Sequence, residues 1–309
     1  MAVILKKSTR PAKTKILGDS DALIGLLFVA PFIILWAVWF LYPFLQSFMI
    51  SFQQFDFSQM DKAKFIGLEN YKNLFVNNPE FLSAITHTVV IVLVAVPVQT
   101  VLALVISVVL NSDIKGKGIF RTIYIIPNII SGIAAATVFM ILFRKDFMLA
   151  RTFSVFGFPN ETWTANPDVA LLFVIILYIW QQVGFFMIIY LSGLQTIPGE
   201  LYEAATVDGA NGLRKFLNVT VPMLKPVTFF SVSYGTIQAF QIFDQIAAIS
   251  RYGKLGSPAD STTTLVTYFF THGRVYPDEM GLGSASVIVF LFIILAITLV
   301  QKKLLEEKE

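Results

Sequence analysis

Long uninterrupted apolar runs dominate the hydropathy pattern of this chain. Five long windows contain no Asp, Glu, Lys or Arg, and a sixth window, 226–250, contains Asp244 as its single charged residue. About 20 predominantly apolar residues in a helix are enough to cross the hydrocarbon core of a bilayer. The pattern therefore predicts six transmembrane helices, near residues 23–50, 84–110, 120–143, 169–193, 223–249 and 280–303.

The composition supports a membrane protein. Hydrophobic residues make up 56% of the 309 residues, charged residues only 14%, and the mean hydropathy is +0.71. Soluble domains carry about 25% charged residues. We therefore expect an all-α polytopic membrane protein. The chain has no cysteine, and its two histidines, His87 and His272, have neither metal-ligand spacing nor a Ser/His pairing, so we predict no metal site and no hydrolase.

The distribution of Lys and Arg predicts the orientation. Alternate segments, beginning with the N-terminus, hold 14 of the 23 basic residues, and the segments on the other side hold nine. Cytoplasmic loops carry the excess of Lys and Arg, so both termini are predicted to be cytoplasmic. The predicted organisation is a basic cytoplasmic N-terminus (1–21), a transmembrane domain (22–305) and a short tail (306–309). No basic residue lies in a span interior, which argues against a voltage sensor and a buried cation for an anionic substrate.

One charged stretch, EAATVDGANGLRKFLNVTVPMLKP at 203–226, interrupts the apolar pattern between the fourth and fifth spans. Several charges together are too costly to place in lipid. Pro198 and Glu200 suit the first turn of a helix, and Gly209 permits a reversal after Asp208. The pattern predicts two short helices joined by a bend. Their apolar side chains either pack on the bundle or form a docking surface, and spacing alone does not decide between these.

The same stretch resembles the EAA loop of importer-type ABC permeases: Glu-Ala-Ala, Asp-Gly-Ala, then Phe216 and Pro222 follow at that spacing. In that family the loop, here about 194–222, forms a coupling helix. It sits in a groove of a cytoplasmic ATPase and transmits nucleotide-driven closure to the membrane domain. The resemblance implies ATPase-coupling roles for Glu203, Ala204, Ala205, Asp208, Gly209, Ala210 and Phe216.

The resemblance covers nearly the whole chain. The segment FIGLENYKNLF (65–75) resembles the Phe-x-Gly-Leu-x-Asn-Tyr signature of carbohydrate-uptake permeases, and GKGIFRTIYIIP (116–127) and FQIFDQI (240–246) are similar to that subfamily. The two ends resemble the first permease type of a maltose-type, two-permease pair, without the large extracytoplasmic insertion of the maltose subunit. One departure is SRYGKLGSPADST (250–262), which stands where that family carries a Thr-x-Gly-Gly-Pro run.

A carbohydrate path needs hydrogen-bonding groups beside flat apolar faces. Tyr234, Gln238, Gln241 and Gln245 are spaced so that they share one face of a continuous helix in the fifth span. Such residues either line a path or join helices, including helices of a partner permease, and both interpretations stay open. The residues predicted to line a substrate path are Asn128, Gln181, Gln182, Tyr234, Gln238, Gln241 and Asp244.

The resulting hypothesis is a non-catalytic permease subunit of an ATP-driven, binding-protein-dependent carbohydrate importer in a bacterial or archaeal cytoplasmic membrane. The chain has no Walker-type Gly-Lys-Ser/Thr, so ATP and Mg are expected on a partner ATPase. The resemblance further implies a second permease, an ATPase dimer and an extracytoplasmic solute-binding protein. The alternatives are an ABC permease for a non-sugar solute and a stand-alone secondary transporter or channel, which would need intramembrane ionisable residues; only Asp244 qualifies.

Overall fold

The computed structural model describes residues 19–250 and 254–305 and divides into two compact units, 1–49 and 50–309. In the first unit, helix α1 (Asp19–Trp36), a π-helical turn (Ala37–Leu41) and helix α2 (Tyr42–Ile50) follow one another without a break. Within them, Leu23–Ile50 is long and apolar enough to cross a membrane, as predicted for the first span.

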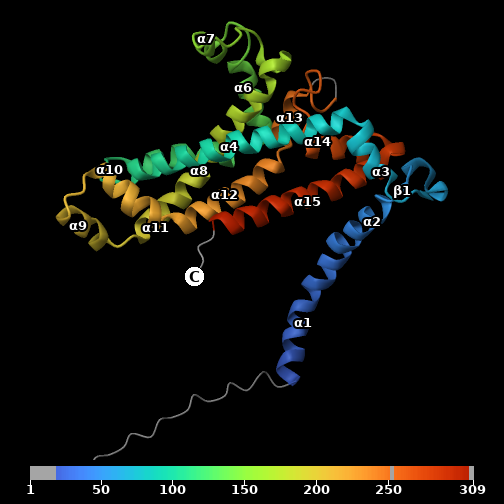
Figure 1. Cartoon of the computed structure of the whole chain (residues 1–309), viewed down its shortest axis with the longest axis horizontal. Helices are drawn as coiled ribbons and strands as arrows, with labels where there is room; N and C mark the ends of the chain where they lie inside the picture. Colours follow the sequence, from blue (N-terminus) through green and yellow to red (C-terminus); the bar gives the residue numbers. More distant parts are fainter. Residues whose placement is uncertain (1–18, 251–253, 306–309) are drawn as a thin grey trace, which may run out of the picture. The chain divides into compact units, whose positions relative to one another are not determined.

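Four helices of the second unit run side by side in an elongated bundle (Figure 1). They are α4 (Pro79–Asn111), α8 (Pro167–Thr196), α12 (Lys225–Phe240) and α15 (Met280–Leu305). The two longest, α4 and α8, begin at helix-start signals that can be recognised in the sequence. The Asn78 side chain accepts a hydrogen bond from the Phe81 N–H at 2.9 Å, and Asn166 caps α8 in the same manner. In both, proline occupies the first helical position, where its missing N–H costs nothing.

The predicted third span is bent rather than straight. It consists of α5 (Lys117–Ile129) and α6 (Gly132–Leu142), whose axes differ by 101°. Ile130 and Ser131 between them have extended backbone conformations. A side chain inserted into the helical hydrogen-bond ladder is one established cause of such a break. Here the Gln181 amide of α8 donates to the Ile130 carbonyl at 3.5 Å, a long contact that compensates part of the lost helical bonding.

The predicted fifth span is also divided. Helix α12 ends at Phe240, residues 241–243 are irregular, and α13 (Asp244–Ile249) follows. In the described residues, four helices are long and apolar enough to cross a membrane, or five if α5 and α6 together count as one span. The number six therefore stays a prediction, although helices occupy all six predicted windows.

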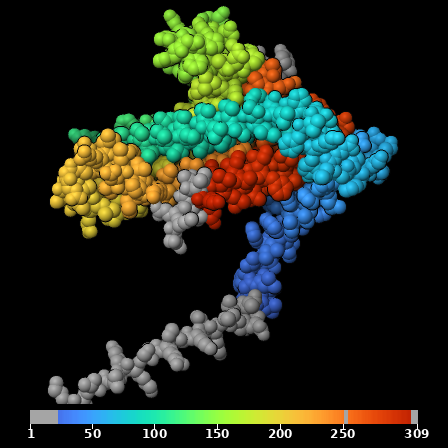
Figure 2. Space-filling view, viewed as in Figure 1, coloured from blue at the N-terminus to red at the C-terminus, as the bar shows by residue number. Residues whose placement is uncertain are grey.

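Shorter elements cluster at the two ends of the bundle and on one side. Strands β1 (Gln53–Gln54) and β2 (Lys64–Phe65) pair antiparallel, with Gln53 opposite Phe65. Helix α7 (Met148–Ser154) and the end of α6 form a knob that stands out from the bundle in Figure 2, with Trp163 fully buried in its aromatic core. The remaining helices are α3 (Glu69–Lys72), α9 (Gly199–Val207), α10 (Gly212–Lys215), α11 (Val221–Met223) and α14 (Leu265–Phe270), with 3-10 turns at Phe57–Lys62, Trp163–Ala165 and Pro277–Glu279 and π-helical turns at Asn73–Asn77, Phe216–Thr220 and Thr271–Val275.

Candidate functional site

The charged loop folds as the two short helices that its sequence predicts. Helix α9 ends in a Schellman motif, in which the Gly209 N–H donates to the Thr206 carbonyl at 3.0 Å and the Ala210 N–H donates to the Ala205 carbonyl at 2.9 Å. Gly209 has a φ of +74°, the left-handed conformation that this motif needs. One difference is at the start of α9, where Pro198 precedes the helix instead of lying within its first turn.

The part of the loop that follows α9, residues 211–224, is joined to the bundle, and we call it the second arm. The Asn211 side chain accepts a hydrogen bond from the Arg214 N–H at 2.9 Å and so begins α10. The π-helical turn Phe216–Thr220 and α11 follow, and α12 begins at Lys225. The Tyr202 hydroxyl of α9 lies 3.0 Å from the Thr220 hydroxyl, and Leu224, which is 1% exposed, packs against Gly193 of α8. A displacement of this loop would therefore reach α12 and α8 directly.

The predicted coupling residues lie in three different environments. A hollow of about 500 Å³ lies between α9 and the second arm, and its lining includes Ala204, Ala205, Asp208 and Ala210. Glu203 and Gly209 are exposed outside it. Phe216 is half-buried and lines another hollow, of about 280 Å³, that also contains Tyr202. The apolar side chains divide in the same way, because Val207, Leu213 and Leu217 are exposed while Tyr202 and Phe216 turn toward the bundle.

Several predicted path residues meet at the bend between α5 and α6, which we call the elbow. The Gln245 amide of α13 donates to the Gln181 side-chain oxygen at 2.7 Å, and the Asn128 amide of α5 donates to the Gln182 side-chain oxygen at 3.0 Å. Asp244 borders the elbow at Gly132, where an added Cβ would lie 2.8 Å from the Asp244 Cβ. Gln181 is buried and Asp244 is exposed, so the cluster reaches from the bundle interior to its surface.

The prediction of one continuous row on the fifth span is wrong. Gln238 and Tyr234 do share a face of α12, and the Gln238 amide donates to the Tyr234 hydroxyl at 2.8 Å. Gln241 lies beyond the last residue of α12 and is exposed, and Gln245 belongs to α13. Residues 241–243 between the two helices are not helical, so helical spacing no longer places these side chains on one face.

The elbow cluster and the Gln238–Tyr234 pair present amide, hydroxyl and carboxylate groups. Amides donate and accept, hydroxyls do both, and an ionised carboxylate only accepts. The aromatic rings of Phe185, Phe230 and Tyr234 lie beside the Gln238 group, with the Phe230 and Tyr234 rings stacked at a centroid distance of 5.7 Å. This combination suits a neutral ligand with both hydroxyls and apolar faces.

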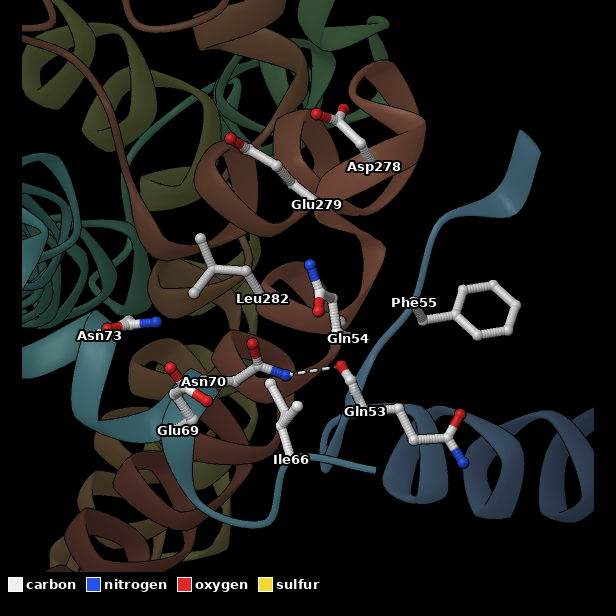
Figure 3. A pocket seen from close by; sticks show the side chains of 11 residues that line it. Gln53, Gln54, Phe55, Ile66, Glu69, Asn70, Asn73, Asp278, Glu279 and Leu282 are labelled. Carbon is white, nitrogen blue, oxygen red and sulfur yellow. Dashed lines mark hydrogen bonds between the residues drawn. The ribbon is translucent and has the colours of Figure 1, made fainter. Parts of the chain in front are cut away.

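The segment 65–75, which resembles the carbohydrate-permease signature, has a structural role that its hydrogen bonds show. The Asn70 amide donates to the carbonyl oxygens of Ser51 and Gln53, each at 2.9 Å, and the Tyr71 hydroxyl lies 2.7 Å from the Ser51 hydroxyl. Figure 3 shows the Asn70–Gln53 bond in a pocket of about 270 Å³ that Glu69, Asp278 and Glu279 also line. The segment therefore fastens β1 to α3 beside the start of α15, where Gly281 leaves room for the Gln53 carbonyl.

One cluster at the same end was not apparent from the sequence. His272, 6% exposed, is hydrogen-bonded to Glu279 and lies 3.8 Å from the Glu80 carboxylate, while its ring lies 4.1 Å from the Tyr268 ring. Burial lowers the pKa of His272, but its interactions with the Glu80 and Glu279 carboxylates outweigh burial and hold the pKa above its ordinary value. Glu80 is far from His272 in the chain, so spacing carries no signal for their contact. Among the described residues, no group of three His, Asp or Glu side chains could hold a metal ion.

One known family and several known proteins resemble the chain over most of its length. The family described as "Binding-protein-dependent transport system inner membrane component" matches residues 71–306. The arabinooligosaccharides transport system permease of Bacillus subtilis is 36% identical over 90% of this chain and 87% of its own length. The lactose transport system permease of Rhizobium radiobacter is 34% identical, covering 87% and 90%, and the trehalose/maltose permease of Thermococcus litoralis is 30% identical, covering 92% and 94%.

Solved structures share the fold. A chain of a bacterial ABC transporter that imports the acidic polysaccharide alginate has a TM-score of 0.76 at 20% identity, covering 92% of this chain and 95% of that chain. A second structure, of an alginate ABC transporter in complex with an alginate pentasaccharide-bound periplasmic protein, has a TM-score of 0.75 at 21% identity.

Proposed function

The chain belongs to the family of binding-protein-dependent transport system inner membrane components, and from this premise we propose that it lines the path of a neutral oligosaccharide importer. As a member it is a non-catalytic, multi-pass permease subunit of an ABC importer in the plasma membrane. The relatives named for arabinooligosaccharides, lactose and trehalose/maltose support a carbohydrate as the cargo.

The observation that carries the proposal is the folded loop between α8 and α12. We assign it as the coupling loop, with Glu203, Ala204, Ala205, Asp208, Gly209, Ala210 and Phe216 as its functional residues. Three features support this assignment. The Schellman turn at Gly209 holds α9 at a defined angle, exposed Val207, Leu213 and Leu217 provide an apolar docking surface, and the second arm continues into α12. A pull on the loop would therefore move α12.

We place the substrate path along the elbow and the adjoining face of α12. Its polar groups would come from the elbow residues Asn128, Gln181, Gln182 and Asp244, from Tyr234 and Gln238 of α12, and from Gln241 directly after α12. Irregular backbone at membrane depth is tolerated where it lines a water-filled cavity or is covered by protein. Both breaks, at 130–131 and at 241–243, occur beside these polar side chains, which is the support for a path there.

The proposed topology keeps the six predicted spans, with α5–α6 and α12–α13 each counted as one interrupted span. Both termini are then cytoplasmic, and the permease domain covers 22–305 between the basic segment 1–21 and the tail 306–309. Residues 1–18 and 306–309 lie outside the described part, so the support for this orientation is the Lys and Arg distribution.

The proposed partners are a second, related permease, a cytoplasmic ATPase dimer that binds ATP and Mg, and an extracytoplasmic solute-binding protein. The solved complex of an alginate transporter with its periplasmic protein supports the last of these. The neutral character of the cargo rests on the path residues, which include one carboxylate and no Lys or Arg. An anionic solute would favour a cation in the path.

The test is to purify the intact importer and ask which ligand stimulates its ATP turnover. We expect the chain to purify with a second permease and an ATPase, and neutral oligosaccharides to stimulate turnover while uronic-acid oligomers do not. Stimulation by the acidic sugars alone would contradict the neutral cargo. Sugar uptake by vesicles that contain this polypeptide alone, without ATP, would support a stand-alone secondary transporter instead.

A further inference from the structure

The middle of helix α4 contains a fully buried amide that faces a glycine. Gln99 is 0% exposed. It lies against Gly235 of α12, where an added Cβ would be 2.6 Å from the Gln99 Nε2 atom and 3.2 Å from the Phe186 ring of α8. Three helices therefore meet around this side chain, and glycine is the residue that allows α12 to approach it.

Gln99 has no hydrogen-bond partner in this arrangement. Within residues 19–250 and 254–305, neither its side-chain nitrogen nor its side-chain oxygen has one. Burial of a polar group without a hydrogen-bond partner is unfavourable, so the amide destabilises the arrangement in which it is found. Such a group calls for an explanation, and a second arrangement in which it is paired is one.

A candidate partner lies one helical turn away. Ser231 precedes Gly235 by four residues, so the two share a face of α12. Ser231 is 0% exposed, and its hydroxyl, close to the Tyr190 hydroxyl, has no hydrogen bond of good geometry to any described residue. Helices α4 and α12 run in opposite directions, which places Ser231 level with Ala103 when Gly235 is level with Gln99. The Gln99 amide and the Ser231 hydroxyl are thus both buried along the contact between α4 and α12, and one helical turn separates them.

We propose that α12 has two registers against α4, and that Gln99 is a positioning residue that stabilises the second register by bonding to Ser231. A slide of α12 by up to one turn, about 5.4 Å, brings Ser231 to Gln99. Shifts of one turn between packed helices are a known form of two-state transition. Because α12 continues from the loop between α8 and α12, nucleotide-driven movement of that loop would select the register; this part rests on the proposed function.

The experiment uses the absence of native cysteine and the complete importer with its ATPase. One variant carries Gln99→Cys with Ser231→Cys, and its matched partner carries Ala103→Cys with Ser231→Cys. We expect oxidation to link 103 to 231 in the resting complex and 99 to 231 in the complex trapped with ATP and vanadate. The same link in both states, or no 99–231 link in a complex shown to be trapped, would overturn the two registers.

A second measurement separates positioning from folding. Gln99→Leu removes the unpaired amide, so it should raise the melting temperature of the resting complex and lower transport about two- to tenfold, the range of one net hydrogen bond. Ser231→Ala should lower transport similarly, and the double variant should lower it no further. Additive losses would mean that the residues act separately, for instance through internal water, and would overturn the pairing. Failure of the ATPase to co-purify would instead contradict the proposed function.

Discussion

Replacement of Gly209 by valine tests whether the geometry of the loop between α8 and α12 carries the coupling. Nothing lies within 4 Å of the position that a Cβ would take, so the substitution creates no steric overlap. The cost arises from the backbone, because φ is +74° and a left-handed conformation costs an L-residue about 1–2 kcal/mol. A β-branched side chain should be at the upper end of this range.

This cost is large for the loop, because relaxation of Gly209 to negative φ would break the two Schellman hydrogen bonds. One or two kcal/mol changes the fraction of correctly folded loop by a factor of about 5–30. We expect Gly209→Val to weaken ATPase binding by about that factor and to lower transport in proportion, with Glu203→Ala much milder. Gly209→Asn should be intermediate, because asparagine tolerates the left-handed region.

The assay is titration of the ATPase against the membrane complex, with sugar uptake into vesicles measured in parallel. Gly212→Ala is the matched control, since Gly212 is three residues away, equally open and without a positive φ. It should bind the ATPase normally. If Gly209→Val binds the ATPase and transports as well as Gly212→Ala does, the reasoning from backbone geometry is refuted and the loop has another role.

Three further predictions concern the path and the opposite end of the bundle. Gln245→Leu should cost about 1–3 kcal/mol of stability, because it leaves the Gln181 oxygen without its donor. Exposed Gln241→Leu is its control, and equal melting temperatures would contradict the elbow cluster. Gln238→Cys should react with a membrane-impermeant thiol reagent in one conformational state and more slowly with bound sugar; absence of labelling in resting and trapped complexes would remove this position from the path. Because the folded pKa of His272 is raised, its stabilisation is complete below the unfolded value of about 6.5 and is lost as pH rises through the folded pKa. The melting temperature of the wild-type complex should therefore fall as the pH rises through the folded pKa of His272. His272→Gln should abolish this fall, and His87→Gln should retain it. An unchanged fall in His272→Gln would show that His272 does not cause it.

Local patterns were sufficient for the loop between α8 and α12. Gly209 after Asp208 predicted the reversal, and the helices on either side formed as α9 and α10. This worked because a Schellman stop depends on the residues within one turn and on the φ that glycine permits. The direction of each apolar side chain did not follow from spacing. Tyr202 and Phe216 turn inward and Leu213 outward because α8 and the π-helical turn provide partners on one side only.

For the path residues, by contrast, local patterns were not sufficient to predict the structure. Hydropathy placed Gln181 and Gln245 within apolar segments, but no spacing within one segment predicts the 2.7 Å bond between them. The expected row from Tyr234 to Gln245 assumed an unbroken helix. Whether a helix breaks depends on whether another segment satisfies the freed backbone groups, as Gln181 does in part at Ile130, and that information lies outside the broken segment.

The sequence by itself determined that this is an apolar, helical membrane protein, where its long apolar segments begin and end within a few residues, and which loop is charged and sharply turned. These properties depend on the transfer of side chains from water to lipid and on local backbone preferences, which act over one helix at a time. Only the tertiary structure decided the 101° elbow, the division of the predicted fifth span, the burial of His272 between two carboxylates and the meeting of Gln99 with Gly235. Each of these requires groups far apart in the chain to satisfy or exclude one another, and that is a property of packing between helices.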